Sequence, residues 1–324
     1  MRAIQVSETG GPEVLHLAEL PDPEPGAGQV LVELAAAGVN YIDTYHRSGA
    51  YPMPLPFIIG SEGAGTVIAV GPEVSGITMG DRVAWAAAPG SYAELTVVPA
   101  EQAVPVPAGV AIDVAAGCLL QGMTAHYLAV SVHAVQPGET VLVHAAAGGM
   151  GLLLTQLATA RGARVIGTVS TAAKEQLARE ARAAEVIRYT EIDDVASEVR
   201  RLTGGDGVAA VYDGVGASTF DASLASLRRR GVLALFGAAS GPVPPVDPQR
   251  LNSAGSVFLT RPKLADYVAT RKELISRAGE VFDAILDGSL RIRIGGRYPL
   301  ADAVRAHQDL QSRRTTGKLL LLTH

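Results

Sequence analysis

The sequence contains very little cysteine and no excess of basic charge. Cys118 is the one cysteine in 324 residues, which excludes an intramolecular disulfide and any zinc site built from several thiolates. In its apolar setting, AAGCLLQGM, we expect Cys118 to be a packing residue. The 27 basic and 32 acidic residues give a net charge of -5. This balance offers no electrostatic footprint for nucleic acid or an anionic membrane, so we expect neither as a partner.

Long uninterrupted apolar runs are also missing. The stretch 138–156 is rich in apolar residues, but His144, Gln156 and several glycines interrupt it, so we do not interpret it as a transmembrane helix. The first residues, MRAIQVSETG, enter strand-like sequence without an apolar signal region or a small-residue cleavage site. We therefore expect a cytoplasmic protein without membrane insertion.

The length and a change of pattern along the chain predict two domains. Residues 1–122 are β-rich, with strands expected at 2–6, 30–37, 65–70, 82–86 and 92–98. From residue 123 strands alternate with helices, and the strands are expected at 141–144, 164–168, 186–188, 208–212 and 232–236. This alternation is typical of a doubly wound parallel sheet in an α/β protein. The tail from residue 262 ends in an expected strand, 317–322, which we expect to join the first domain because an isolated strand needs a sheet.

The segment GETVLVHAAAGGMGLLLTQ, which starts at Gly138, predicts a phosphate-binding turn. Ala146, Gly148 and Gly151 occupy the three positions of the G-x-G-x-x-G fingerprint, with Ala in place of the first Gly. Small residues let the strand turn sharply, let the backbone approach a pyrophosphate, and let the N–H groups at the start of the helix face the anion. Such turns also serve close packing alone, but the alternating strands that follow favour dinucleotide binding.

The sequence after the second strand of this pattern favours NADP over NAD. NAD-binding proteins place an acidic residue there to bind the ribose 2′-hydroxyl, whereas residues 167–171 read GTVST. Ser170 and Thr171 can donate hydrogen bonds to a 2′-phosphate, and Lys174 can add positive charge. The alternative is that Lys174 is an ordinary solvated helix lysine. Gly214 and the segment 236–239 follow later strands, at positions that are expected to border the nicotinamide.

The chain resembles the quinone oxidoreductases of the zeta-crystallin type, within the medium-chain dehydrogenase/reductase superfamily, from end to end. The resemblance rests on GVNYIDTYHRSGAYP from Gly38, the glycine segment from Gly138, VYDGVG from Val211, LFGAASG from Leu235 and TRP from Thr260. It implies a Rossmann NADP-binding domain, 123–261, and a β-rich GroES-like catalytic domain, 1–122, completed by 262–324. It also implies a homodimer that pairs through the edge of the Rossmann sheet, where the apolar segment 256–260 is expected.

The resemblance further implies which residues form the site between the two domains. Asn40, Asp43 and Tyr45 would be catalytic residues that orient the acceptor, and Tyr41 and Tyr51 would bind the substrate, since tyrosine rings can stack on a planar quinone. Alternatively, Tyr45 and Tyr51 merely cover a loop. The residues implied to bind NADPH are Thr124, Tyr127, Ala146, Gly148, Gly149, Met150, Gly151, Ser170, Thr171, Lys174, Tyr189, Gly214, Phe236, Gly237, Ala238, Ala239, Arg261 and Arg313, with the adjacent Arg314 as the alternative to the last.

Two positions differ from the zinc-dependent alcohol dehydrogenases of the same superfamily. Those enzymes carry a cysteine and a histidine as zinc ligands where this chain has Asn40 and Ser61. Neither an amide nor a hydroxyl replaces the softer nitrogen and sulfur donors of a catalytic zinc site. We therefore expect no metal, and we expect Glu62 to be a structural carboxylate.

The predicted function is NADPH-dependent reduction of a small-molecule quinone. Reduction of the activated double bond of an enal or enone is the nearest alternative, because it uses the same transfer geometry. A different class is a non-catalytic, NADPH-binding protein with a crystallin-like or RNA-associated role, for which Arg228, Arg229 and Arg230 offer a local basic patch. A serine hydrolase is not favoured, because Ser240 lies in GAASG and not in G-x-S-x-G.

Overall fold

The computed structural model describes residues 1–312 and 314–323 and divides into two compact units. Unit 1 consists of Met1–Met123 together with the C-terminal segment from Val268, and unit 2 is Thr124–Tyr267. The expected domain boundaries were 122/123 and 261/262. The first boundary lies one residue later than expected. The second lies six residues later, because η3 (Leu264–Tyr267) belongs with unit 2.

Unit 2 is built on a parallel sheet with the strand order β11-β10-β9-β12-β13-β14. The chain enters at the central strand β9, winds outward to β11, returns beside β9 as β12 and winds outward the other way. This is the doubly wound arrangement, so the predicted Rossmann-type fold is confirmed. The strands are β9 (Thr140–Val143), β10 (Arg164–Val169), β11 (Glu185–Arg188), β12 (Val208–Asp213), β13 (Leu227–Leu235) and β14 (Phe258–Thr260).

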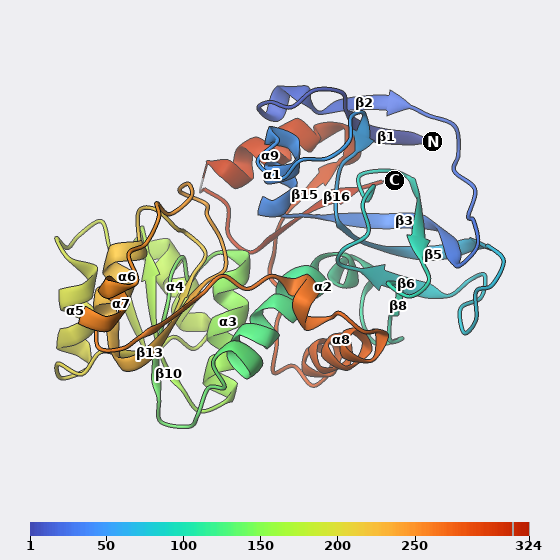
Figure 1. The fold of residues 1–324 in the computed structure, drawn as a ribbon. Coiled ribbons are helices and arrows are strands. Elements are labelled where there is room, and N and C mark those ends of the chain that lie inside the picture. The colour runs from blue at the N-terminus through green and yellow to red at the C-terminus, as the bar shows by residue number, and fades with distance from the viewer. Residues whose placement is uncertain (313, 324) are drawn as a thin grey trace. The chain divides into compact units, whose positions relative to one another are not determined.

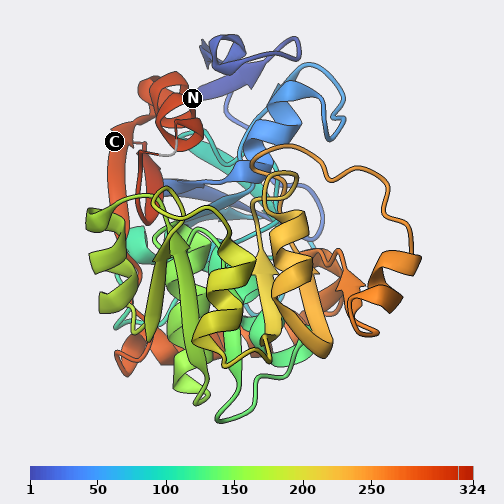
Figure 2. The ribbon, with the colours of Figure 1, turned by 90° about the vertical axis from the view of Figure 1, so that its left-hand side faces the viewer.

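Helices cover both faces of this sheet, which explains why its central strands β9 and β12 are buried along nearly their whole length. Helix α3 packs on α4, and α5 packs on α6. Figure 2 views this unit from the side of α5 and α6. Leu142, Ile166, Val211 and Leu233 are buried in its core. The helices are α3 (Gly149–Ala160), α4 (Ala172–Glu180), α5 (Val195–Leu202), α6 (Phe220–Ser226) and α7 (Gln249–Ser253).

Unit 1 contains a mixed sheet with the strand order β15-β16-β3-β5-β6-β8, and β7 also pairs with β3. Strand β16 pairs antiparallel with β3, with Leu321 opposite Ala37, so the C-terminal segment supplies strands to the sheet that begins at the N-terminus (Figure 1). The strands are β3 (Gln29–Val39), β5 (Glu62–Val70), β6 (Arg82–Trp85), β7 (Leu95–Pro99), β8 (Val104–Pro105), β15 (Ile294–Pro299) and β16 (Lys318–Leu322), and a smaller sheet holds β2 (His16–Glu19), β1 (Arg2–Val6) and β4 (Phe57–Ile58).

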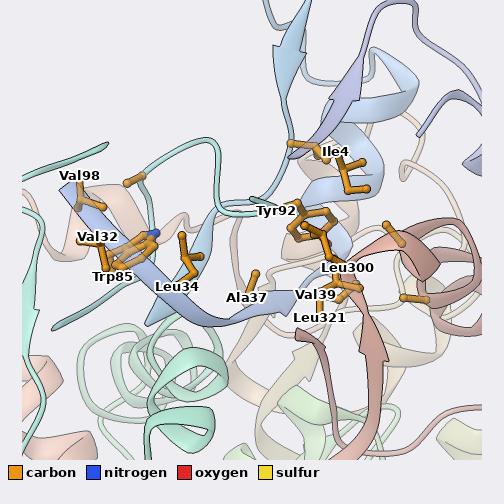
Figure 3. Close-up of a cluster of buried hydrophobic side chains, with 14 of the residues drawn as sticks. Ile4, Val32, Leu34, Ala37, Val39, Trp85, Tyr92, Val98, Leu300 and Leu321 are labelled. Atoms are coloured by element: carbon orange, nitrogen blue, oxygen red, sulfur yellow. The ribbon is translucent and has the colours of Figure 1, made fainter. Parts of the chain in front are cut away.

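The core of unit 1 gathers side chains from segments that lie far apart in the sequence. Ile4, Trp85, Tyr92 and Leu321 are all buried in it (Figure 3). The indole Nε1 of Trp85 donates to Ser91 Oγ at 2.9 Å, which satisfies the one polar atom of that ring.

The remaining helical segments are η1 (Pro12–Val14), α1 (Tyr41–Ser48), α2 (Ile112–Tyr127), the π-helical turn η2 (Leu128–Val132), α8 (Arg271–Leu286), η4 (Leu300–Asp302) and α9 (Ala303–Gln311). Within the described residues, every helix is too short or too polar to span a bilayer.

A pair of glycine substitutions tests the tight packing of α3. A Cβ at Gly151 would lie 2.6 Å from the Cα of Ala146, a residue with no exposed surface, so Gly151→Ala forces the backbone to shift. Overpacking of this kind costs about 1–3 kcal/mol of unfolding free energy. The matched control is Gly279→Ala in α8, where nothing lies within 4 Å of the added methyl. That change should stabilise the helix by up to about 1 kcal/mol. Urea unfolding measures both, and equal effects at the two positions would contradict this packing.

Candidate active site

The residues expected to bind the cofactor in unit 2 follow the carboxyl ends of its parallel strands. Parallel strands in one sheet end at the same edge, which is where open α/β sheets bind their ligands. Five neighbouring strands, from β11 to β13, each contribute a segment there. These segments contain Ala146 to Gly151 after β9, Ser170 and Thr171 after β10, Tyr189 after β11, Gly214 after β12, and Phe236 to Ala239 after β13.

The turn after β9 has the geometry that a pyrophosphate needs. Ala145 adopts a positive φ of 51°, and the N–H of Ala146 donates to Thr168 O at 3.0 Å, which anchors the turn to β10. Gly148 is the N-cap of α3 and carries no side chain. The N–H groups of the first turn of α3 have no partner within the helix, and an anion can accept from them. The residues present therefore fit a dinucleotide.

The segment after β10 offers hydroxyl groups and one lysine for a 2′-phosphate. The Thr171 side chain caps α4 by accepting a hydrogen bond from the backbone N–H of Lys174 at 3.3 Å. Its oxygen therefore has a structural task, and only its O–H remains to donate to a ligand. Lys174 lies in the same first turn of α4, and the helix dipole adds to its attraction for an anion. Tyr189 follows β11 and is 44% exposed, so its ring is accessible.

The loops after β12 and β13 are locked together. The N–H of Ala239 donates to Gly214 O at 3.2 Å, and a Cβ on Gly214 would lie 2.7 Å from the ring of Phe236. Arg261 Nη1 donates to Leu235 O at 3.1 Å, which ties the TRP segment to the end of β13. Sequence reasoning missed Asp213. Its Oδ1 stabilises the loop after β12 by accepting from the N–H groups of Val215 and Gly216 at 2.8 and 3.0 Å.

A buried histidine that sequence reasoning did not assign supports the same edge. His144 Nδ1 lies 3.0 Å from Thr168 Oγ1, and its Nε2 lies 3.0 Å from Ser223 Oγ. The Ser223 hydroxyl donates in turn to Asp213 Oδ2 at 2.7 Å. Burial lowers the pKa of His144, so the ring is held neutral between two hydroxyl groups. This chain links the ends of β9, β10 and β12 beneath the loops.

Tyr127 and Thr124, which are predicted to bind the cofactor, lie in α2, and Arg313 lies outside the described residues. Tyr127 is 1% exposed, and its ring stacks on Tyr267 with centroids 4.2 Å apart and planes 3° apart. The Tyr127 side chain is therefore enclosed by protein, and its assignment as a cofactor-binding residue stays a prediction. Thr124, one turn earlier in α2, is half-buried. Arg313 lies outside the described residues, and its neighbour Arg314 is exposed, with its N–H donating to Ser312 Oγ at 3.3 Å.

In unit 1 a buried ion pair lies where β3 ends and α1 begins. Lys318 Nζ lies 2.6 Å from Glu62 Oε2, and the two side chains are 2% and 0% exposed. Lys318 also donates to Asn40 Oδ1 at 2.6 Å, while Asn40 Nδ2 donates to Glu62 Oε2 at 2.9 Å. The second oxygen of Glu62 accepts from the backbone N–H of Leu120 in α2 at 2.8 Å. Four elements, β3, β5, β16 and α2, are thus joined at one point.

Asp43 forms a second buried network beside the first. It is the N3 residue of the capping box of α1 and accepts from the N–H of Asn40 at 2.8 Å. Its carboxylate also accepts from the Tyr92 hydroxyl at 2.9 Å and from Ser61 Oγ at 3.2 Å. Burial raises the pKa of Asp43 to about 6, although these hydrogen bonds and the charge of Lys318 oppose the rise. The Tyr92 hydroxyl lies 3.1 Å from His307 Nε2, and burial, assisted by Arg47, lowers the pKa of His307 to about 3.

These contacts change the roles expected for Asn40 and Asp43. Both side chains are closed inside protein hydrogen bonds, so neither has a free atom with which to contact a quinone. They hold the start of α1 in place instead. The tyrosines keep accessible surface: Tyr41 and Tyr45 are half-buried, and Tyr51 is 44% exposed with its ring centroid 5.3 Å from that of Tyr45.

The same contacts bear on zinc. Asn40 and Ser61 stand at the positions of two zinc ligands in the zinc dehydrogenases, and here they bond to Lys318 and Asp43. The Lys318 side chain, which forms an ion pair with Glu62, already occupies Asn40 Oδ1 at 2.6 Å. Over the part of the chain that the structure describes, no cluster of three or more His, Cys, Asp or Glu side chains is arranged to hold a metal ion.

Comparison with known proteins agrees with this geometry. Residues 26–108 match the model of an alcohol dehydrogenase GroES-like domain, and residues 149–278 match that of a zinc-binding dehydrogenase. A quinone oxidoreductase of Pseudomonas aeruginosa is 46% identical over 99% of both chains. The chain belongs to the quinone oxidoreductase family. Its two matched domains place it in the medium-chain dehydrogenase/reductase superfamily, as the sequence motifs predicted.

Two solved structures of similar chains contain NADPH. A mycobacterial protein complexed with NADPH is 59% identical, with a TM-score of 0.97 over 99% of this chain and 100% of that one. The Escherichia coli quinone oxidoreductase complexed with NADPH is 43% identical, again with a TM-score of 0.97, over 99% and 100% of the chains. This quinone oxidoreductase family also has a relative with another name, a 2-haloacrylate reductase of Burkholderia, which is 41% identical over 99% and 98% of the chains.

Substitution of Lys318 tests the buried ion pair. Lys318→Met leaves the Glu62 carboxylate buried without its charge partner, which should cost about 3–5 kcal/mol of unfolding free energy. Lys318→Met combined with Glu62→Gln removes both charges and should recover most of that loss. Arg201→Ala, which breaks an exposed pair with Glu198, is the control and should leave the unfolding free energy unchanged. Denaturant unfolding of the three variants measures this, and a double variant no more stable than Lys318→Met would refute the pairing.

Proposed function

We propose that this chain is an NADPH-dependent quinone oxidoreductase that works without zinc. The observation that carries the proposal is the cofactor edge of unit 2, where a phosphate-binding turn is followed by Ser170, Thr171 and Lys174 in place of an acidic residue. Membership of the quinone oxidoreductase family and the NADPH found in two similar structures support it.

The roles of the residues follow from their positions. Bound NADPH supplies the reducing equivalents. The first turn of α3 would hold the pyrophosphate, Ser170 and Lys174 would hold the 2′-phosphate, and the joined loops at Gly214 and Phe236 would border the nicotinamide. Tyr41, Tyr45 and Tyr51 give the planar acceptor aromatic surface, and the Lys318–Glu62–Asn40 network holds α1 rigid beneath them.

Reduction of an activated carbon–carbon double bond is the second candidate activity. The Burkholderia relative, whose name describes it as a reductase of a haloacrylate, favours it. A third possibility is an NADPH-binding protein without turnover, in a crystallin-like or RNA-associated role. These three functions differ in which acceptors oxidise NADPH.

An acceptor panel tests the function. The chain is first dialysed against a chelator, and NADPH oxidation is then followed with 1,4-benzoquinone, 9,10-phenanthrenequinone, crotonaldehyde and an enone. We expect turnover with at least one quinone that exceeds turnover with the enal and the enone, because aromatic side chains favour a planar ring. Faster turnover with the enal or enone would assign the second function. NADPH binding without any turnover would assign the third, and activity that returns only on adding zinc would refute metal independence.

Lys174→Ala tests the choice of cofactor. Hydrogen bonds to charged groups contribute roughly 1.5–3 kcal/mol, so loss of the lysine should raise the dissociation constant for NADPH by about 10- to 100-fold. NADH lacks the 2′-phosphate, and its affinity should barely change. Lys272→Ala, on α8 of unit 1, is the control and should alter neither. Fluorescence titration at low and high salt measures this, and the NADPH penalty should shrink as salt screens the charge. Equal weakening of both cofactors would contradict the assignment.

We also propose a homodimer formed through the edge of the Rossmann sheet. Strand β14 is the last strand in the sheet order, so one side of it has no ladder partner among the described residues, and Phe258 on it is 61% exposed. Unpaired edges with apolar side chains favour pairing with another strand. We expect light scattering to give a dimer mass at micromolar concentration for the wild type and a monomer for Phe258→Asp. Met79→Asp, at an exposed loop residue of unit 1, should remain a dimer. A wild-type monomer would refute the proposal.

A further inference from the structure

The hydrogen bonds around Asp43 form a chain whose direction is fixed at one end. A guanidinium can only donate, so Arg47 Nη1, at 3.1 Å, makes His307 Nδ1 the acceptor. The neutral His307 then carries its proton on Nε2 and donates it to the Tyr92 oxygen, 3.1 Å away. The Tyr92 hydroxyl must therefore donate onward to Asp43 Oδ2 at 2.9 Å. While His307 is neutral, this side of the chain cannot reverse.

The two oxygens of Asp43 are consequently unequal. Oδ2 accepts from both Tyr92 and the N–H of Asn40, at 2.9 and 2.8 Å. Oδ1 accepts only the longer bond from Ser61 Oγ, at 3.2 Å. A proton that binds Asp43 therefore binds Oδ1, and it then donates to Ser61 Oγ. Protonation of Asp43 therefore reverses the hydrogen bond between Asp43 Oδ1 and Ser61 Oγ. The Ser61 hydroxyl can then donate its own hydrogen to a group other than Asp43.

Ser61 is also the least buried member of the chain. It is 8% exposed, whereas Arg47 is 2% exposed and Asp43, Tyr92 and His307 have no exposed surface. The charge that acts on Asp43 is that of Lys318 of β16, which is paired with Glu62 of β5. Beyond Tyr92 the chain continues to His307 of α9 and then to Arg47 of α1. Lys318 favours the carboxylate and burial favours the acid, and the balance raises the pKa of Asp43 to about 6. Both protonation states of Asp43 are therefore populated near pH 6.

We propose that Ser61 delivers the proton that completes reduction of the acceptor, and that Asp43 supplies this proton to Ser61. The inference rests on the proposed function. Transfer of a hydride equivalent to a quinone leaves a hydroquinone monoanion, which still needs one proton. The Ser61 O–H bond breaks as the phenolic O–H bond forms, and the Asp43 O–H proton restores the serine hydroxyl. The resulting Asp43 carboxylate takes its next proton from water through Ser61 after the product has left.

Ser61→Ala and Tyr92→Phe test the two parts of this route. Steady-state and single-turnover rates of quinone reduction are measured between pH 5 and pH 9, in H₂O and in D₂O, together with the dissociation constant for NADPH. The infrared carbonyl band of the protonated carboxyl is titrated in the cofactor-free chain. Ser48→Ala, an exposed serine in the last turn of α1, is the matched control. Asp43→Asn identifies the infrared band.

Because the proton donor must be protonated, the wild-type rate should fall as pH rises past the pKa of Asp43. Ser61→Ala should lose this fall and the solvent isotope effect and be at least about 10-fold slower at pH 6, within the range that general acid catalysis contributes. Its affinity for NADPH should be unchanged. Tyr92→Phe removes a donor from Asp43 Oδ2, so both the infrared titration and the fall in rate should move to higher pH. A merely structural role would not produce this shift.

The results distinguish failure of the proton route through Asp43 and Ser61 from failure of the proposed quinone reductase function. A wild type that does not oxidise NADPH with any quinone would refute the proposed function. A wild type that turns over, but whose pH profile and isotope effect survive Ser61→Ala, would overturn the route and leave solvent as the proton source. An infrared titration of Asp43 that Tyr92→Phe does not move would also overturn it.

Discussion

The buried ion pair between Lys318 and Glu62 is the contact on which unit 1 depends. Burying a carboxylate and an ammonium away from water costs free energy. The cost is offset only when the two groups form an ion pair and their remaining donors and acceptors form hydrogen bonds. Asn40 and the N–H of Leu120 provide those partners. The pair therefore fixes β16 against β3 and β5, and it fixes the start of α1, from which the tyrosines project. Removing either charge alone leaves a buried charge, so the chain must keep both or neither.

The ion pair also bears on metal chemistry. In the zinc dehydrogenases of this superfamily the equivalent positions hold metal ligands, and here one of them, Asn40, accepts from Lys318. The positive charge at this point thus belongs to a side chain with a fixed hydrogen-bond geometry. The Lys318 ammonium holds its neighbours in place by donating to Asn40 Oδ1 and Glu62 Oε2. The Ser61 hydroxyl, beside this pair, likewise donates within the protein, to Asp43 Oδ1.

The second buried network responds to acid in two opposing ways. The pKa of His307 is lowered to about 3, so the unfolded chain binds a proton that the folded chain does not, and stability is lost as pH falls from 6.5 towards 3. The pKa of Asp43 is raised to about 6, so the folded chain binds a proton first, and stability is gained as pH falls from 6 towards 3.8. Both groups contact the Tyr92 hydroxyl, and their contributions oppose each other over the same range of pH. The two titrations therefore partly cancel in their effect on stability as the pH falls from 6 towards 3.8.

The sequence by itself determined the doubly wound sheet, the phosphate-binding turn and the cofactor edge, because these features are local. The alternation of strands and helices, the small residues at Ala146, Gly148 and Gly151, and the missing acid after β10 all lie within short stretches of chain. Only the tertiary structure decided the buried networks. Lys318 appears in the sequence as a lone charge at the start of the apolar run KLLLL, and its partners Asn40 and Glu62 lie more than 250 residues away. Asn40 and Asp43 had the residue types of a catalytic pair, but pairing of β16 with β3 and packing of α9 near α1 enclosed them. Side-chain burial depends on such long-range contacts, which no local pattern records.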